Sequence, residues 1–386
     1  MKQRRRHPLT LRAAYKDDLH KRLCDYITDT NFSRNGQSTD MPMLKKAVKF
    51  WLDAFFALRA LIALRRLRQP SLVILTYHRV LAEDDSHRLC EQPGMIVSPG
   101  HLRNHIAIME SLGAVPMFLD DWLEQQKQSP ENLPRLAFAV TFDDGWRDNF
   151  TQGLPVLREK NTPATIFLVS DFLDTKHVFW PEQILHLLTT VPPATVKRCL
   201  PGTLDWLRDY ARDFRLGERK LSIEDADKVI NRLKTLDDFE IYEHLKKTFN
   251  QCPELQPRAE TAYILQAADI DALVDSGLIR FGAHTRNHAR LNRLQSIEQL
   301  KDEVVNCKQL LEERLKNPIG LFCYPNGDIT PDGERLVEAH YTAACTTETG
   351  LNRASTSPFK LRRLNLHDGN ARHTLGLLAT LGKGKL

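Results

Sequence analysis

The sequence predicts an α/β fold in which helices surround a barrel-like parallel sheet. From residue 71 onward, short runs rich in β-forming residues recur, and most are continuously apolar, which indicates strands covered on both faces. Helical patterns with recognisable ends lie between these runs, as in alternating α/β folds. The chain has 386 residues, 42% of them hydrophobic, so it can bury a core of that size.

Seven strands are expected. They cover residues 71–77, 136–142, 164–169, 278–282, 320–325, 341–347 and 361–366. The first, "SLVILTY", and the second, "LAFAVTF", have the most continuous apolar character. Runs of this kind are expected to be strands buried on both faces of the sheet.

The helices between the strands have clear start and stop signals. Ser98 is a typical N-cap, Pro99 suits the first turn, and Gly113 indicates the end of the same helix. Ser296 and Gln299 have the spacing of a capping box at the start of a second helix, "SIEQLKDEVVNCKQLLEERL".

The alternation is interrupted between residues 175 and about 268, where the sequence is helical and polar with a charged middle. We expect a helical insertion inside one domain, because strand patterns flank it on both sides. The barrel then covers 71–375 and the last residues, 376–386, are expected to be a tail.

The N-terminal part has a different character. Residues 1–42 are expected to be a disordered extension, and Met43 would also make a natural first residue. Residues 43–70 form a basic amphipathic pattern whose apolar stretch is too short for a bilayer span and contains Asp53 and Arg59. Two interpretations stay open: a peripheral membrane contact through residues 43–68, or a helix packed on the barrel or on a partner.

Charge and cysteine content exclude some classes of protein. The formal charge of +5 is mild, and no arginine-rich run alternates with aromatic residues as a nucleic-acid groove would need. The seven cysteines form no CxxC pair, which argues against a disulfide framework and for a reducing compartment. With no secretory pattern at the start, we expect a cytoplasmic protein, with the inner face of the membrane as an alternative address.

Chemically active residues follow three of the predicted strands. Asp143 and Asp144 come at the end of "LAFAVTF", His284 and His288 follow "LIRFG", and Asn326 lies in the "YPNG" that ends another strand. In a parallel α/β barrel the carboxyl ends of the strands face a common mouth, so these groups are expected to converge.

Two histidines four residues apart can bind one metal ion from a single turn of chain. One carboxylate and two imidazoles make a three-ligand site with open positions, as in catalytic metal sites. The second carboxylate would then be free to act on water, whose pKa a bound cation lowers to about 7. Another pair with the same spacing, His101 and His105, lies on an ordinary amphipathic helix and is not expected to bind metal.

Together, "TFDDG", "HTRNH" and an apolar strand ending in Pro-Asn-Gly resemble the polysaccharide deacetylases of the NodB-homology group, carbohydrate esterase family 4. The resemblance covers residues 71–370. It implies a distorted (β/α)7 barrel that removes N-acetyl groups from amino sugars with a divalent metal. Zinc is the expected metal, with cobalt, manganese and nickel as alternatives.

The resemblance also implies roles for individual residues. Asp144, His284 and His288 would bind the metal, and Asp143 would be the general base. The backbone N–H of Asn326 would help to stabilise the oxyanion.

The sequence departs from the family in its third motif, where many members have an arginine that orients the base. Here residues 323–326 read Cys-Tyr-Pro-Asn, which resembles a variant subgroup with "YP-x-G" and leaves the orientation of the base unexplained. Arg362 and Arg363 on the last strand are expected either to reach the mouth or to form ion pairs at the rim. The general acid is His78, at the end of the first strand, or His367, and the resemblance favours His78.

Tyr324, Pro325 and Trp146 are expected to contact the sugar, with core packing as the equal alternative for the aromatic rings. The predicted function is N-deacetylation of a saccharide, possibly lipid-linked, in the biosynthesis of a surface polysaccharide or glycolipid. Two alternatives stay open: hydrolysis of a non-sugar amide or cyclic ureide on the same scaffold, and saccharide binding without catalysis. The sequence does not fix the oligomeric state.

Overall fold

The structure is a computed structural model that describes residues 43–200, 202–257 and 263–386. The extension expected over 1–42 lies outside the described residues. The chain divides into two compact units between Leu52 and Asp53, inside helix α2 (Met43–Arg65). The sheet and the candidate site belong to the second unit.

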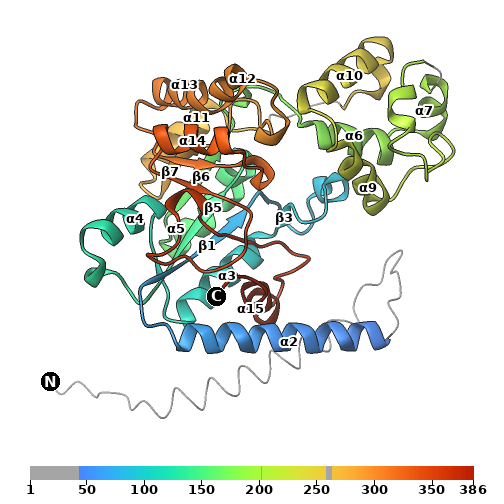
Figure 1. Cartoon of the computed structure of the whole chain (residues 1–386). Coiled ribbons are helices and arrows are strands. Elements are labelled where there is room, and N and C mark those ends of the chain that lie inside the picture. The colour runs from blue at the N-terminus through green and yellow to red at the C-terminus, as the bar shows by residue number, and fades with distance from the viewer. Residues whose placement is uncertain (1–42, 201, 258–262) are drawn as a thin grey trace. The chain divides into compact units, whose positions relative to one another are not determined.

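A parallel sheet forms the centre of this unit, and it has the seven strands that the sequence predicts (Figure 1). In spatial order they are β10 (Leu364–Asn365), β1 (Ser71–Tyr77), β5 (Leu136–Phe142), β6 (Ala164–Leu168), β7 (Ile279–Ala283), β8 (Leu321–Cys323) and β9 (Ala343–Cys345). The short β4 (Val115–Pro116) also pairs with β5, and β2 (Arg79–Val80) pairs separately with β3 (Ile96–Val97).

The sheet is a distorted half-barrel. Its two ends, β9 and β10, are linked by a single bridge between Cys345 and Leu361, which lies just before β10. The α/β fold with a barrel-like sheet is therefore confirmed.

Strands β1 and β5 explain why the site lies at one end of the sheet. Every side chain of β1 and β5 is buried, as expected for strands covered on both faces. Their register pairs Tyr77 with Phe142, so both strands end at the same level. The N–H of Asp143 continues the ladder by donating to the carbonyl of Tyr77 at 3.0 Å. His78 and Asp143 therefore leave the sheet side by side.

Helices cover the sheet. They are α3 (Pro99–Ser111), α4 (Leu119–Gln128), α5 (Leu154–Lys160), α11 (Ala267–Asp275), α12 (Ile297–Lys301), α13 (Cys307–Leu315) and α14 (Pro331–His340). The cap at Ser98 and the capping box of Ser296 with Gln299 are both present, as predicted.

One expected helix, over residues 296–315, is present and contains a π-helical turn, Asp302–Asn306, between α12 and α13. This turn contains Glu303, a buried carboxylate that accepts hydrogen bonds from the backbone N–H groups of Arg286 and Asn287 at 2.9 and 2.8 Å. Glu303 thus holds the loop that carries His284 and His288.

The predicted insertion is present between β6 and β7, and it is helical. It contains α6 (Trp180–Thr189), α7 (Pro193–Cys199), α8 (Asp205–Arg208), α9 (Ile223–Leu233) and α10 (Asp238–Gln251), shown in green to yellow in Figure 1. Its apolar residues form a hydrophobic cluster of their own. A buried ion pair fastens it to the barrel, because Asp238 accepts two bonds from Nε of Arg290, at 3.1 and 3.0 Å.

The C-terminal residues, expected to be a tail, are mostly helix α15 (Thr374–Lys383), which packs beside α2 (Figure 1). Nζ of Lys383 lies 2.9 Å from a carboxylate oxygen of Asp53. Gly382 allows the close approach, because a Cβ at this position would overlap the carbonyl oxygen of Phe56. Among the described residues, no helix is both long and apolar enough to cross a membrane.

Candidate active site

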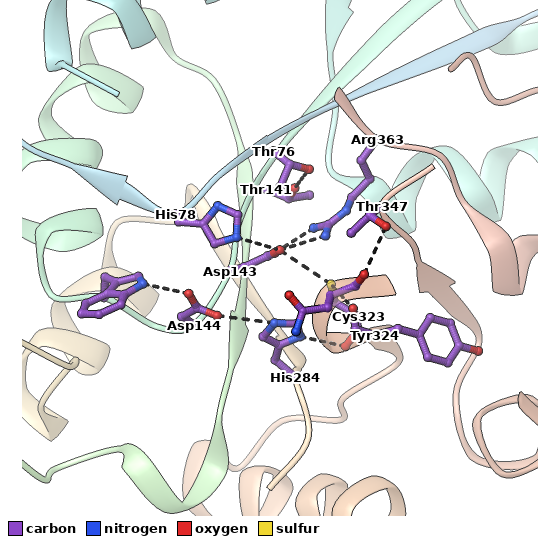
Figure 2. Close-up of polar contacts among 12 residues, drawn as sticks. Thr76, His78, Thr141, Asp143, Asp144, His284, Cys323, Tyr324, Thr347 and Arg363 are labelled. Carbon is purple, nitrogen blue, oxygen red and sulfur yellow. Dashed lines mark hydrogen bonds and ion pairs between the residues drawn. The ribbon is translucent and has the colours of Figure 1, made fainter. Parts of the chain in front are cut away.

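Two adjacent carboxylates diverge at the end of β5. Asp143 follows the strand directly, but Asp144 has φ of 73°, a left-handed conformation that is costly for a residue other than glycine. Gly145 continues the turn with the same φ of 73°. Because the chain reverses direction here, the two carboxylates reach different partners, as Figure 2 shows.

Asp144, His284 and His288 form a cluster of three potential metal ligands. Oδ1 of Asp144 lies 3.4 Å from Nε2 of His284 and 3.3 Å from Nε2 of His288. His288 also has a left-handed backbone, with φ of 58°. Such conformations concentrate at functional sites because they aim side chains that a regular backbone could not.

Neighbouring groups hold these ligands in place. Nδ1 of His284 lies 2.7 Å from the carbonyl oxygen of Cys323. When the Nδ1–H donates to this oxygen, Nε2 is unprotonated and its lone pair is available to a metal ion. Trp146 donates its indole N–H to Oδ2 of Asp144 at 2.9 Å. Oδ1 of Asp144 is buried and has no hydrogen-bond partner among the described residues.

This set fits a divalent cation. Burial raises the pKa of Asp144, but the nearby His284 and His288 side chains outweigh burial and bring that pKa well below its usual value. An ionised carboxylate with an unpartnered buried oxygen, beside two imidazoles, is the donor set that a catalytic zinc site uses.

The second carboxylate is occupied by an arginine. Nη1 and Nη2 of Arg363 donate to the two oxygens of Asp143 at 2.7 and 2.8 Å, and both side chains are buried. Burial raises the pKa of Asp143, but the charge and hydrogen bonds of Arg363 lower it below its usual value. With both oxygens engaged, Asp143 is poorly placed to bind a metal and well placed to stay ionised as a base.

The arginine that the third motif lacks is therefore supplied by the residue that precedes β10. The sequence left the orientation of Asp143 unexplained, and Arg363 accounts for it. Arg362, its neighbour, faces elsewhere, with Nε 3.6 Å from Glu348. The thiol of Cys323 lies 3.8 Å from Asp143, and burial raises its pKa, so it remains a neutral packed group.

His78 is the histidine nearest to Asp143. Its Nε2 lies 3.8 Å from Oδ2 of Asp143, and its buried Nδ1 has no hydrogen-bond partner in the described part of the chain. His367, the other candidate acid, is absent from the cavity lining, and its Nδ1 accepts from the N–H of Gly369 at 3.1 Å. The geometry thus places His78 beside the predicted base.

The three potential ligands, the Asp143–Arg363 pair and His78 all line one cavity of about 510 Å³. One wall comes from the barrel, and a second comes from the loop that contains Gln92 and Met95. The helical insertion forms a further wall with Trp180, Glu182, Asp227, Asn231, Lys234 and Asp238.

Comparisons with known proteins agree with this geometry. A family model described as polysaccharide deacetylase matches residues 131–200 and 243–344, which include both aspartates and both histidines. The chain belongs to the polysaccharide deacetylase family. The unmatched residues between the two segments, 201–242, lie within the insertion, whereas α6, α7 and part of α10 belong to the matched segments.

Individual relatives of this deacetylase-family chain are distant. The Bacillus subtilis protein YxkH, itself described only as a candidate polysaccharide deacetylase, is 36% identical over 62 residues. That match covers 16% of this chain and 21% of YxkH, so the chain aligns with about a fifth of its curated relative.

Solved structures support the fold. The Streptococcus pyogenes deacetylase PplD, solved with acetate, has a TM-score of 0.52 at 15% identity and covers 81% of this chain and 99% of its own. IcaB from Ammonifex degensii reaches 0.50 at 16% identity, covering 80% and 97%. BC0361, a polysaccharide deacetylase from Bacillus cereus, also reaches 0.50 at 16% identity, covering 82% and 70%.

Within this family member, the three residues expected to contact sugar occupy different positions. Tyr324 belongs to the cavity lining, but its ring is fully buried, 5.1 Å from the ring of Phe322, and points away from the carboxylates in Figure 2. Pro325 is buried and does not line the cavity. Trp146 lines the cavity but is only 2% exposed, so its clearest contact is the hydrogen bond to Asp144.

Asn326 lies where the family resemblance places an oxyanion-binding residue. It lines the cavity with φ of 54°, and Thr347 donates its hydroxyl to the Asn326 carbonyl at 3.3 Å. The role of Asn326 stays a prediction.

Proposed function

We propose that this protein is a metal-dependent hydrolase that removes N-acetyl groups from an amino-sugar saccharide. One observation carries the proposal: a three-ligand cluster, Asp144 with His284 and His288, shares a cavity with a carboxylate that Arg363 keeps ionised. A ligand set, a separate base and a histidine acid are the groups that amide hydrolysis needs. We also propose that the chain represents a subgroup with "YP-x-G" as third motif, in which the arginine before β10 replaces the missing one.

Asp144, His284 and His288 would hold the cation, and zinc suits a site of one carboxylate and two imidazoles; cobalt, manganese and nickel are alternatives. When bound, the cation supplies Lewis-acid activation of water and of the acetyl carbonyl. The remaining chemistry belongs to the protein's own side chains.

Asp143 is the general base. It accepts the proton of the water that attacks the acetyl carbon, and Arg363 both orients its oxygens and keeps it ionised before the reaction. The N–H of Asn326 is proposed to donate to the oxygen that becomes negatively charged.

The second proton transfer is assigned to His78. Breaking the C–N bond leaves an amine, which needs a proton as it departs, and acetate is the other product. His78 lies 3.8 Å from Asp143 and carries a buried ring nitrogen without a partner among the described residues. It is therefore proposed to give its proton to the leaving nitrogen.

The substrate is proposed to be an N-acetylated saccharide from a surface-polysaccharide or glycolipid pathway. The family and the cavity support this class, because a cavity of about 510 Å³ with polar walls accommodates a sugar unit with its neighbours. Residues 201–242 of the insertion lie outside the part of the chain that the family model matches. They line the cavity with Asp227, Asn231, Lys234 and Asp238, so this wall is the place where preference for a particular glycan would arise.

The decisive experiment measures acetate release from N-acetylglucosamine oligomers with and without added zinc or cobalt. Asp144→Asn is expected to abolish metal-dependent release, while Asp143→Asn should retain the metal and lose turnover. His101→Gln is the matched control, because His101 belongs to the second HxxxH pair of the chain and does not line the cavity. Metal content, measured separately by mass spectrometry, reports on the ligand set without depending on the substrate.

The outcomes separate the alternatives. Turnover of small amides or cyclic ureides, with none of amino sugars, would move the function to another C–N bond. Sugar binding with no metal-dependent release from any N-acetyl saccharide would indicate a binding protein and refute the proposal.

A further inference from the structure

Helix α2 has two faces of different character. One face is buried in the second unit, where Ala57, Ala60 and Leu64 are at most 5% exposed. Polar contacts join this face to α15: Asp53 pairs with Lys383, and Arg59 donates to the carbonyl of Gly384, the residue after α15, at 3.0 Å. The sequence left open whether this helix packs on the barrel, and its buried face does so.

The other face of α2 is apolar and exposed. The side chains of Trp51, Phe55 and Leu58 are 71%, 62% and 57% exposed. The complete row consists of Val48, Trp51, Leu52, Phe55, Leu58 and Ile62. Apart from the adjacent Trp51 and Leu52, the members follow one another at three- and four-residue spacing along the single helix α2, so they form a stripe on one face of this helix. Isolated apolar residues on a surface are common, but a stripe of this length indicates a binding surface.

Positive charge accompanies the stripe. The exposed basic residues of this segment are Lys46, Lys49, Arg59, Arg65, Arg66 and Arg68. Asp53 is the one acidic residue between 43 and 68, and it is buried and paired with Lys383. Lys46 and Lys49 lie toward one end of the exposed stripe, Arg65, Arg66 and Arg68 lie toward the other, and no exposed acidic residue between 43 and 68 offsets these charges.

We propose that the exposed face of α2 binds the surface of an anionic lipid bilayer, with the helix lying parallel to the membrane plane. Large apolar side chains would enter the region below the headgroups, and the lysines and arginines would contact the anionic headgroups. The same charges disfavour a second copy of the chain as the occupant, because pairing two α2 helices would bring basic ends together.

This binding does not depend on the proposed deacetylase activity. If both hold, the protein works at a membrane surface, where a lipid-linked saccharide would be its substrate. Such an address is compatible with the cytoplasmic side of the membrane.

The test is flotation of the full chain with vesicles of phosphatidylcholine alone and of phosphatidylcholine with 30% phosphatidylglycerol, at low and high salt. We expect binding to the anionic vesicles that weakens at least tenfold at high salt. Phe55→Ser combined with Leu58→Ser is expected to lower the partition coefficient at least tenfold, because both side chains leave water on binding. Arg65→Gln with Arg66→Gln should weaken binding and flatten its salt dependence.

A matched control replaces two exposed apolar residues elsewhere, Val274→Ser with Leu310→Ser, which are 42% and 38% exposed on α11 and α13. This variant should bind as the original chain does, and thermal unfolding should show that every variant is folded. Failure of the full chain to bind anionic vesicles would overturn the proposal. Equal binding by the variant with both Phe55 and Leu58 replaced would also overturn it. So would a full chain that does not bind vesicles but forms a dimer, if the same two substitutions dissociate that dimer. Vesicle binding is read without substrate, so its failure is distinguishable from failure of the deacetylase proposal.

Discussion

The pairing of Arg363 with Asp143 yields the most informative prediction. Arg363→Gln removes a positive charge that contacts both carboxylate oxygens at 2.7 and 2.8 Å in a buried setting. Burial alone raises the pKa of Asp143, and the arginine is the main cause of its lowering. Without Arg363, the pKa of Asp143 should therefore rise above its usual value.

The size of the shift follows from the charge separation. Opposite charges roughly 4 Å apart attract by about 4 kcal/mol at an effective dielectric constant of 20. At about 1.4 kcal/mol per pKa unit this is an upper limit of about three units, and measured effects of a neighbouring arginine are about one to three units. Since the base must be ionised to act, the acid limb of kcat/KM should move to higher pH by that amount. At a pH well above the new pKa, much of the rate should return.

The assay is the pH profile of acetate release at saturating metal. Arg363→Lys keeps the charge but loses the two-pronged contact, so it should lower kcat while shifting the acid limb less. Arg362→Gln is the control, because this neighbouring side chain contacts Glu348 and Leu351 instead of Asp143. An acid limb that stays in place in an active, folded Arg363→Gln enzyme would show that the arginine does not set the ionisation of the base.

Three further predictions follow from single contacts. Trp146→Phe keeps an aromatic ring but loses the hydrogen bond to the carboxylate of Asp144, so zinc affinity in a competition titration should fall about 10- to 100-fold. The control is Trp122→Phe, because the buried N–H of Trp122 has no partner among the described residues. This control should leave zinc affinity unchanged. Asp238→Asn leaves the buried charge of Arg290 without its partner, so the free energy of unfolding, measured by urea denaturation, should fall by about 3 kcal/mol. The insertion should also be cleaved faster by a protease, and cleavage at the original rate would contradict this prediction. Burial lowers the pKa of His105 to about 4, so the folded state holds it neutral while the unfolded state takes up a proton below pH 6.5. Stability should therefore be complete above pH 6.5 and decrease by at most about 3 kcal/mol as the pH falls to 4, and His105→Gln should remove this part of the pH dependence in urea unfolding.

The strands and helix caps could be predicted because their signals are local. A continuously apolar run such as "LAFAVTF" has few ways to be buried other than as a central strand, and Ser98 caps a helix through bonds within three residues. The expected helix over 296–315 is present, but its π-helical turn was not predicted. Within that turn, Glu303 contacts the backbone of residues 286–287, and such a partner cannot be read from the sequence of the helix itself.

The identity of the three ligand candidates was also local, since Asp144, His284 and His288 occur in short motifs at strand ends. The contacts of Tyr324 and Trp146 were not predictable in the same way. An aromatic residue beside a strand end can face the cavity or the core, and the backbone turn decides which. Here Tyr324 packs in the core, and Trp146 donates to Asp144.

By itself, the sequence determined the α/β class, the positions of the strands along the chain, the helical insertion and the residues that can bind a metal. These follow from apolar periodicity and from motifs only a few residues long. The tertiary structure alone decided which arginine holds the base and which histidine stands beside it. Arg363 and Asp143 are 220 positions apart in the chain, and they meet because β10 and β5 flank β1 in the same sheet. Contacts between residues so far apart depend on the order of the strands in space, which no local pattern encodes.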